Sequence, residues 1–414
     1  MRRRALLGAA LLAAPAAAPA AVPALAQAAP KVVVIGGGFG GATAARALHR
    51  LGVAVTLVER EETYLSCPFS NAVIAGLREM EAQRFGYEGL RREGIALVLQ
   101  AARTVEDRRV VLADGTALPF DRLVMAPGIA LHADAVPGLD TEAMPHAWRA
   151  GPQTLLLRRQ LEAMEDGGLV VLSAPANPYR CPPGPYERAS LVAHYLKTRK
   201  PRSKLILLDA KDAFSKQKLF EEAWAALYPG LLEWVPLSSG GKVVEVDAAA
   251  RVVRTEFDEY QAAVANIIPP QSAGRIAQAA GLTDRSGWCP VDPASFESRL
   301  RPGIHLIGDA IIAGAMPKSA FAANAQARVC AEAVAALLRG EAPAPPKLIN
   351  TCYSLVEPGY GISIAGVYQP QDGLLADVPG AGGTSPLGAP HAVRAAEAGY
   401  AEDWFRTITA DAFG

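Results

Sequence analysis

Two segments of the chain show the same order of hydrophobic and polar positions: an apolar run, a turn, an amphipathic stretch and a second apolar run. The first segment begins with VVVI at residues 32–35, continues through ATAARALHR and ends with AVTLVE at Glu59. The second begins with LVVLSA at residues 169–174, continues through ASLVAHYLKTRK and ends with KLILLD at Asp209. Short apolar runs that alternate with helical stretches predict strand–helix–strand units of parallel sheets.

The first segment carries a glycine turn directly after its first strand. Gly36, Gly38 and Gly41 form GxGxxG. Small residues let the backbone approach a pyrophosphate, and the start of the next helix offers N–H groups and partial positive charge. Glu59 follows about 20 positions later, where an acidic residue can accept hydrogen bonds from ribose hydroxyls. This combination predicts a bound dinucleotide, because a glycine turn without a ligand leaves Glu59 unexplained.

The second segment has prolines where the first has glycines. Five prolines stand between its strand and its helix: Pro175, Pro178, Pro182, Pro183 and Pro185. Proline has no backbone N–H donor and does not allow the close approach that glycine gives. We therefore predict a Rossmann-like scaffold without a phosphate site, in which Asp209 is a relic of a ribose acceptor.

Two later segments complete the predicted organisation. GIHLIGDA at residues 303–310 reads as a strand that ends at Gly308 and Asp309. This pair could either bind a sugar or ribityl hydroxyl or cap the amphipathic helix that follows. After a proline-rich linker at residues 340–347, an alternating apolar pattern predicts strands and then a final short helix.

The predicted fold class is α/β, with two Rossmann-like dinucleotide-binding domains and a smaller α+β C-terminal domain. The first domain is non-contiguous and comprises residues 31–139 and 271–340. Residues 140–270 form the second domain, inserted into the first, and residues 347–414 form the C-terminal domain.

Charge and the N-terminal segment restrict the possible partners and location. Basic and acidic residues balance at 41 each, so no overall field favours nucleic acid or anionic lipid. Residues 1–26 combine an arginine cluster, an apolar run and a small-x-small end, which predicts an export signal. The adjacent arginines indicate the twin-arginine route to the periplasm. Prolines interrupt the apolar run, which argues against a retained membrane anchor.

The chain has five cysteines: Cys67, Cys181, Cys289, Cys330 and Cys352. An exported protein meets an oxidising compartment in which a disulfide persists, and an odd count leaves at least one cysteine unpaired. The sequence contains no CxxCH motif, so it has no c-type haem site of its own, and no spacing suggests a metal site. Cys330 has apolar neighbours and reads as a buried small hydrophobe, whereas Cys289 has no assigned role.

Several motifs together resemble the flavoprotein subunit of flavocytochrome c sulfide dehydrogenase. They are GGGFGG with Glu59, TYLSCPFSN around Cys67, APG at 126–128, YRCPPGPYER around Cys181, GIHLIGDA, and NTCYSLVEPGYGISI around Cys352. The resemblance spans most of residues 31–370. It implies a glutathione-reductase-like fold with FAD in the first domain, attached covalently to Cys67 through the 8α-methyl group.

The resemblance also assigns the redox-active residues. Cys181 and Cys352 match a disulfide that lies over the flavin ring, and Glu187 matches a proposed catalytic glutamate. Alternatively, Glu187 provides only a favourable N-terminal charge for a helix predicted to start near Ala189.

The function implied by the resemblance is periplasmic oxidation of sulfide. Hydrosulfide would attack the disulfide, and FAD would pass the electrons to a separate c-type cytochrome subunit that carries haem. A sulfide:quinone oxidoreductase is the main competing function, but it needs a membrane-binding segment, and AVRAAEAGYAEDWFRTI is short and polar. We expect no nucleic-acid partner and no stable membrane insertion.

Two more functions are disfavoured. An NAD(P)H-linked disulfide or ferredoxin reductase would need a second glycine turn. A non-enzymatic flavin carrier or assembly protein would leave without a use the cysteine pair that the resemblance implies.

Overall fold

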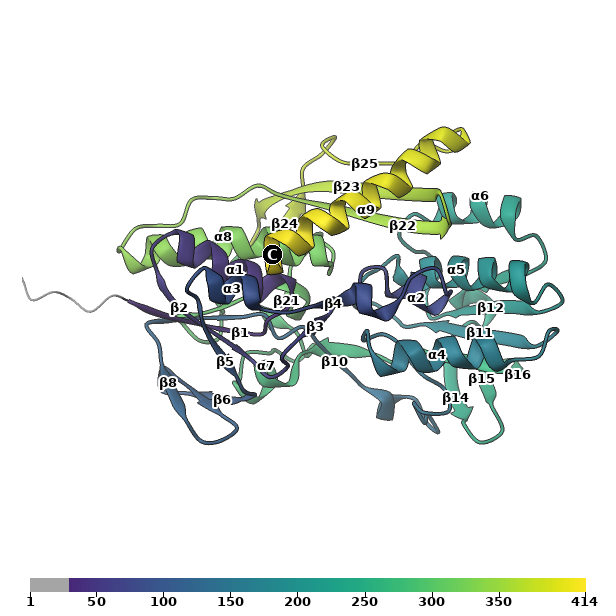
Figure 1. Cartoon of the computed structure of the whole chain (residues 1–414), viewed down its shortest axis with the longest axis horizontal. Coiled ribbons are helices and arrows are strands. Elements are labelled where there is room, and N and C mark those ends of the chain that lie inside the picture. The colour runs from purple at the N-terminus through teal and green to yellow at the C-terminus, as the bar shows by residue number, and fades with distance from the viewer. Residues whose placement is uncertain (1–29) are drawn as a thin grey trace, which may run out of the picture.

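The computed structural model describes residues 30–414. The predicted export signal at residues 1–26 therefore lies outside the described residues. Two parallel sheets lie side by side along the long axis of the molecule, and the C-terminal strands and helix cross above both of them (Figure 1).

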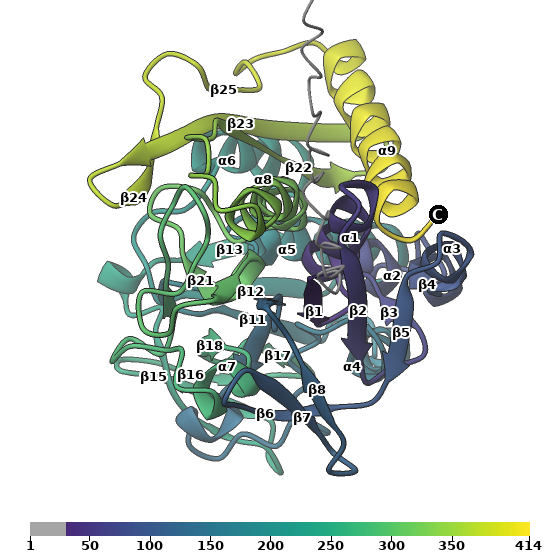
Figure 2. The same cartoon turned by 90° about the vertical axis from the view of Figure 1, so that its left-hand side faces the viewer.

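The first sheet has the strand order β20-β9-β1-β2-β5, and all of its strands are parallel. Its strands are β1 (Lys31–Ile35), β2 (Ala54–Glu59), β5 (Ala96–Leu99), β9 (Arg122–Met125) and β20 (Ile304–Leu306). Helices α1 (Phe39–Arg50) and α8 (Ala320–Leu338) pack together and lie between this sheet and the C-terminal strands (Figure 2). Strand β20 comes from the late GIHLIGDA segment, so this domain is built from two separate stretches of the chain.

The second sheet has the strand order β13-β12-β11-β17 and is also parallel. It consists of β11 (Leu169–Ala174), β12 (Lys204–Asp209), β13 (Leu232–Val235) and β17 (Val264–Ile267). Helix α5 (Gly184–Arg199) connects β11 to β12. The helix predicted to start near Ala189 thus begins five residues earlier, because Pro185 in its first turn has a backbone angle that already suits a helix.

The two sheets are linked by a pair of antiparallel strands. Strand β10 (Ile129–Leu131) leaves the first domain, and β18 (Gln271–Ala273) returns to it. The chain therefore enters and leaves the second domain at one place.

Smaller elements complete the two domains. The strands are β3 (Tyr64–Leu65), β4 (Arg84–Phe85), β6 (Ala102–Glu106), β7 (Arg109–Leu112), β8 (Ala117–Pro119), β14 (Val243–Asp247), β15 (Val252–Thr255), β16 (Glu259–Gln261), β19 (Cys289–Pro290) and β21 (Ile311–Ile312). The helices are α2 (Ser70–Ile74), α3 (Glu88–Arg92), α4 (Pro152–Ala163), α6 (Gln217–Leu227) and α7 (Arg275–Ala279).

The C-terminal part is an antiparallel sheet followed by one long helix. Strands β22 (Leu348–Glu357), β23 (Tyr360–Gln371) and β24 (Leu374–Asp377) pair in sequence order, and β25 (Gly383–Thr384) pairs with β23. Helix α9 (His391–Phe413) has 23 residues, so the prediction of a short final helix was wrong. Several of its buried positions are alanines, which give only a weak hydrophobic signal in the sequence.

The end of α9 is anchored on the first domain. The ring of Phe413 lies 5.5 Å from that of Phe39, 5.2 Å from that of Tyr64 and 5.3 Å from that of Phe85. Arg46 of α1 donates hydrogen bonds to the last carbonyl groups of α9. The contact fixes the C-terminal helix beside the glycine turn.

We predict that Phe413→Ala lowers the free energy of unfolding by about 3 kcal/mol, because the substitution leaves a cavity among these aromatic rings. Tyr400→Ala on the same helix is the matched control, since Tyr400 is 56% exposed. Tyr400→Ala should lower the free energy of unfolding by about 0.5 kcal/mol or less. Denaturant unfolding measures both, and equal losses in the two variants would contradict the predicted anchor.

Candidate active site

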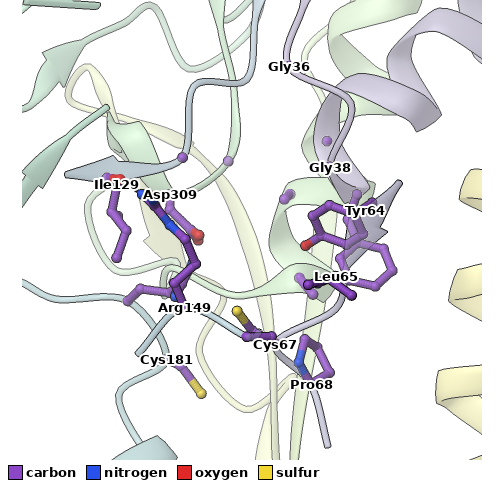
Figure 3. A pocket seen from close by; sticks show the side chains of 18 of the residues that line it. Gly36, Gly38, Tyr64, Leu65, Cys67, Pro68, Ile129, Arg149, Cys181 and Asp309 are labelled. Atoms are coloured by element: carbon purple, nitrogen blue, oxygen red, sulfur yellow. Dashed lines mark hydrogen bonds between the residues drawn. The ribbon is translucent and has the colours of Figure 1, made fainter. Parts of the chain in front are cut away.

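A cavity of about 1210 Å³ lies where the two Rossmann-like domains meet β22 of the C-terminal domain. It is large enough for a dinucleotide. All the predicted site residues except Gly41 line it, namely Gly36, Gly38, Glu59, Cys67, Cys181, Glu187, Gly308, Asp309 and Cys352. In Figure 3 the glycine turn lies at one end, and Cys67 and Cys181 lie together at the other.

The glycines of the turn are required by its geometry. Gly36 has a φ of +96°, and a Cβ atom there would lie 2.4 Å from the carbonyl oxygen of Ala126. A Cβ at Gly41 would lie 1.7 Å from the carbonyl oxygen of Gly36. Gly41 therefore lets α1 pack on the first strand, while the N-terminus of α1 faces the cavity.

Glu59 is held at the end of β2 by backbone donors. Its carboxylate accepts hydrogen bonds from the N–H groups of Gly37 at 2.6 Å and Glu61 at 3.0 Å. A carboxylate fixed in this way at the cavity wall can accept hydrogen bonds from a ribose.

Asp309 presents an oxygen to the cavity that has no hydrogen-bond partner among the described residues, although it is buried. Burial raises the pKa of this carboxyl, and the positive charges of Arg180 and Lys318 oppose the rise. Asp309 does not cap α8, because the N-cap of that helix is Ser319. A buried polar oxygen calls for a donor, and a ribityl hydroxyl is such a donor, so the site fits FAD.

The three cysteines of the cavity come from three parts of the chain. Cys67 follows β3, Cys181 precedes α5 and Cys352 lies in β22. All are free thiols in this structure, so the predicted disulfide between Cys181 and Cys352 is not formed here. The buried Cys289 and Cys330 are also free thiols, and neither lines the cavity.

The backbone at Cys181 is tightly held. Its φ is +57°, its N–H donates to the carbonyl oxygen of Lys318 at 2.8 Å, and its own carbonyl accepts from Gly184 at 2.8 Å. Burial raises the pKa of the Cys181 thiol, and the negative charges of Cys352 and Glu187 raise it further.

Glu187 lies in the first turn of α5, but its carboxylate bonds to other elements. It accepts a hydrogen bond from the Asn71 amide at 2.8 Å and one from the Leu355 backbone N–H at 2.9 Å. Burial raises the pKa of Glu187, and these two donors only partly oppose the rise. The carboxyl group can therefore hold a proton closer to neutral pH than an exposed glutamate.

Sequence reasoning missed the residues that hold Glu187 in place. Arg188 is buried; it donates to the side-chain oxygen of Asn71 at 2.9 Å and lies over the ring of Trp148 at 4.8 Å. Asn71 therefore forms hydrogen bonds with two consecutive residues of α5, Glu187 and Arg188. Their only sequence signal is proximity, since Asn71 follows Cys67 by four positions and Arg188 follows Glu187.

Asp209 is engaged by the protein itself. It is fully buried and accepts hydrogen bonds from the Tyr186 hydroxyl at 2.6 Å, the Lys211 ammonium at 2.5 Å and the Trp234 indole at 3.1 Å. This engagement agrees with the prediction that Asp209 is a structural relic of a ribose acceptor. It is the centre of a buried cluster that occupies the place of a ribose acceptor.

Family models match three stretches of the chain. Residues 154–269 match the family model described as the central part of the sulfide dehydrogenase [flavocytochrome c] flavoprotein chain, and residues 344–413 match the flavocytochrome c sulphide dehydrogenase flavin-binding model. Residues 30–163 match the pyridine nucleotide-disulphide oxidoreductase family.

Two solved structures are similar in fold. The sulfide:quinone oxidoreductase from Aquifex aeolicus has a TM-score of 0.74 and 17% identity, with 92% of each chain covered. The ferredoxin reductase for the CYP199A2 system from Rhodopseudomonas palustris has a TM-score of 0.62 and 18% identity, with 82% of each chain covered. These similarities confirm the predicted fold class of two Rossmann-like domains with a smaller C-terminal domain.

A sequence relative specifies the family. The sulfide dehydrogenase [flavocytochrome c] flavoprotein chain from Chlorobaculum thiosulfatiphilum is 56% identical over 45 residues, which cover 10% of this chain and 94% of the relative's sequence. Together with the two family models, this match indicates a flavin-dependent oxidoreductase that acts on sulfur compounds. The chain belongs to the family of flavocytochrome c sulfide dehydrogenase flavoprotein chains.

Proposed function

We propose that the protein is a periplasmic sulfide dehydrogenase that works through a disulfide between Cys181 and Cys352 and delivers electrons through FAD to a separate c-type cytochrome. The observation that carries the proposal is that these two cysteines, from different domains, line one cavity together with Glu187.

The proposed chemistry is thiol–disulfide exchange. Hydrosulfide forms a new S–S bond to one cysteine, and the bond between the cysteines breaks, which leaves a thiolate on the other. A second hydrosulfide then displaces the outer sulfur as hydrogen disulfide, which leaves both cysteines reduced. Both cysteines are then thiolates, and their return to the disulfide releases two electrons.

Glu187 is the proposed proton carrier of this cycle. It lines the same cavity as both cysteines, and burial raises its pKa. A carboxyl group in such a setting can accept the proton that leaves a thiol or a persulfide and pass it on.

FAD, when bound, accepts the two electrons and can release them singly. The glycine turn, Glu59, Gly308 and Asp309 would hold it, because they provide the close backbone approach and the acceptor oxygens that a dinucleotide requires. Cys67 lines the same cavity and is the proposed covalent attachment point.

The electron acceptor is proposed to be a haem-bearing partner chain. This sequence has no CxxCH, so a c-type haem must be supplied by another subunit. The name of the family, flavocytochrome c, supports such a partner. The arginine-led segment at residues 1–26 supports export to the periplasm, where such cytochromes act.

Delivery to a membrane quinone is the competing function. It is favoured by the fold similarity to the sulfide:quinone oxidoreductase. Within residues 30–414, no helix has the length and apolar character needed to cross a bilayer. In α9, Phe405, Ile408 and Phe413 pack inward, whereas Val393 and Tyr400 of the same helix are exposed.

We predict that the flavin remains with acid-denatured protein, because a thioether bond through Cys67 survives unfolding. The measurement is yellow colour in the precipitate compared with the supernatant. In Cys67→Ala the flavin should move to the supernatant, whereas the buried Cys330→Ala should keep it in the precipitate. Release of all FAD from the native protein would refute the linkage.

We also predict that NADH and NADPH do not reduce the flavin at a useful rate. The turn before α5 lacks glycines. The Asp209 carboxylate already accepts hydrogen bonds from Lys211 and Tyr186, so it is not free to bind a ribose. Anaerobic mixing with NADH should leave the flavin absorbance unchanged, while sulfide should bleach it. Rapid bleaching by NADH would instead indicate a pyridine nucleotide-linked reductase.

The decisive variant is Cys181→Ser, Cys352→Ser. We expect it to bind FAD but to lose reduction by sulfide, because no disulfide remains to accept the nucleophile. A merely structural disulfide would stabilise the fold by roughly 4–5 kcal/mol in the chain-entropy model without affecting this reaction. Stopped-flow flavin reduction, with FAD content and thermal unfolding as controls, separates the two roles. Native-rate reduction in the variant would overturn the mechanism.

A further inference from the structure

A buried lysine, Lys216, contacts the backbone of Cys352. Lys216 is the N-cap of α6 in the second domain and is only 6% exposed. Its ammonium group donates to the carbonyl oxygen of Cys352 at 2.9 Å and to the hydroxyl of Ser354 at 2.7 Å. The Lys216 side chain therefore links the second domain to β22, the strand that contains Cys352.

The charge of Lys216 has no direct counter-ion in the described part of the chain. Its hydrogen bonds all go to neutral oxygens, two carbonyl groups and one hydroxyl group. No carboxylate of residues 30–414 forms an ion pair with it, in contrast to the buried Lys211, which pairs with Asp209. A buried charge without a partner is costly, so a compensating anion is expected nearby.

The candidate anions near Lys216 come from β22, α5, α9 and the turn before α5. Burial lowers the pKa of Lys216 to about 8, and negative charge at Cys352, Glu187, Cys181 and Glu397 opposes the fall. Of these four, the two cysteines gain negative charge only when a thiolate forms.

We propose that Lys216 is a positioning residue for the sulfide reaction, whose ammonium group stabilises the thiolate of Cys352 when the disulfide opens. The inference rests on the proposed function and identifies the positive group that balances the thiolate charge in it. Hydrosulfide forms its new S–S bond at Cys181, the bond to Cys352 breaks, and the electron pair of that bond stays on the Cys352 sulfur. The Asn350 side-chain amide, which donates to that sulfur at 3.3 Å, assists from the same strand.

The test measures the thiolate directly and uses no sulfide. In the reduced Cys181→Ser protein, the pH dependence of alkylation of Cys352 by iodoacetamide reports the pKa of its thiol, with mass spectrometry of the Cys352 peptide as the readout. We expect Lys216→Met to raise that pKa by about one unit, so that alkylation at neutral pH becomes about tenfold slower. Lys216→Arg should restore most of the rate.

Two matched controls separate charge from structure. Lys218→Met removes an exposed lysine from the same helix and should leave the alkylation profile unchanged. Ser354→Ala removes a hydrogen-bond partner of Lys216 but keeps the charge, so it should shift the profile much less than Lys216→Met. If Lys216→Met does not fold, Lys216→Gln, which keeps a hydrogen-bond donor, carries the same expectation.

Either of two results would overturn the inference. One is an unchanged Cys352 profile in Lys216→Met or Lys216→Gln, even with lowered thermal stability, since that would leave Lys216 only a structural link. The other is a Ser354→Ala shift as large as that of Lys216→Met. Failure of the proposed function would be seen separately, as sulfide reduction that survives loss of both cysteines.

Discussion

One partly buried carboxylate, that of Glu187, joins the three parts of the molecule at the cysteine pair. It belongs to α5 of the second domain, accepts a hydrogen bond from Asn71 of the first domain and accepts another from the backbone of Leu355 in the C-terminal sheet. Because each donor comes from a different domain, the carboxylate fixes where β22 lies relative to α5. The separation of Cys181 and Cys352 depends on that position.

The same junction concentrates charges that are costly to bury. Arg188 and Lys216 are almost completely buried near Glu187. Each donates hydrogen bonds to backbone carbonyl oxygens of neighbouring segments. Removing one partner from a buried charged network typically costs about 3–5 kcal/mol, because the other group is left without compensation. The domains are therefore held together by the groups that also set the electrostatics of the sulfur chemistry. Variants at this junction must be assessed for folding and for chemistry separately.

Features that follow local rules were predictable from the sequence, whereas contacts between distant segments were not. The glycine turn with Glu59 was readable because close approach to a pyrophosphate demands small residues at fixed spacing, as Gly36 and Gly41 show. The start of α5 was misplaced because prolines were read as a break, although proline suits the first turn of a helix. The length of α9 was underestimated because several of its buried positions are alanine, which gives a weak hydrophobic signal. Nothing in the local sequence marks Lys216 as a neighbour of Cys352, 136 positions away, because their contact depends on how the domains pack.

The second Rossmann-like domain shows how a nucleotide scaffold can serve a different use. Its parallel sheet still directs the carboxyl ends of its strands toward the cavity, but the turn after β11 now carries Cys181 instead of a glycine phosphate loop. The acidic residue at the end of β12 is closed off by Lys211 and Tyr186, so the place of a ribose acceptor has become part of the core. With that space filled, the domain offers the flavin side a rigid backbone with a sulfur atom on it. In the proposed reaction, a small nucleophile would reach this sulfur by diffusion and would not need a binding site for a carrier.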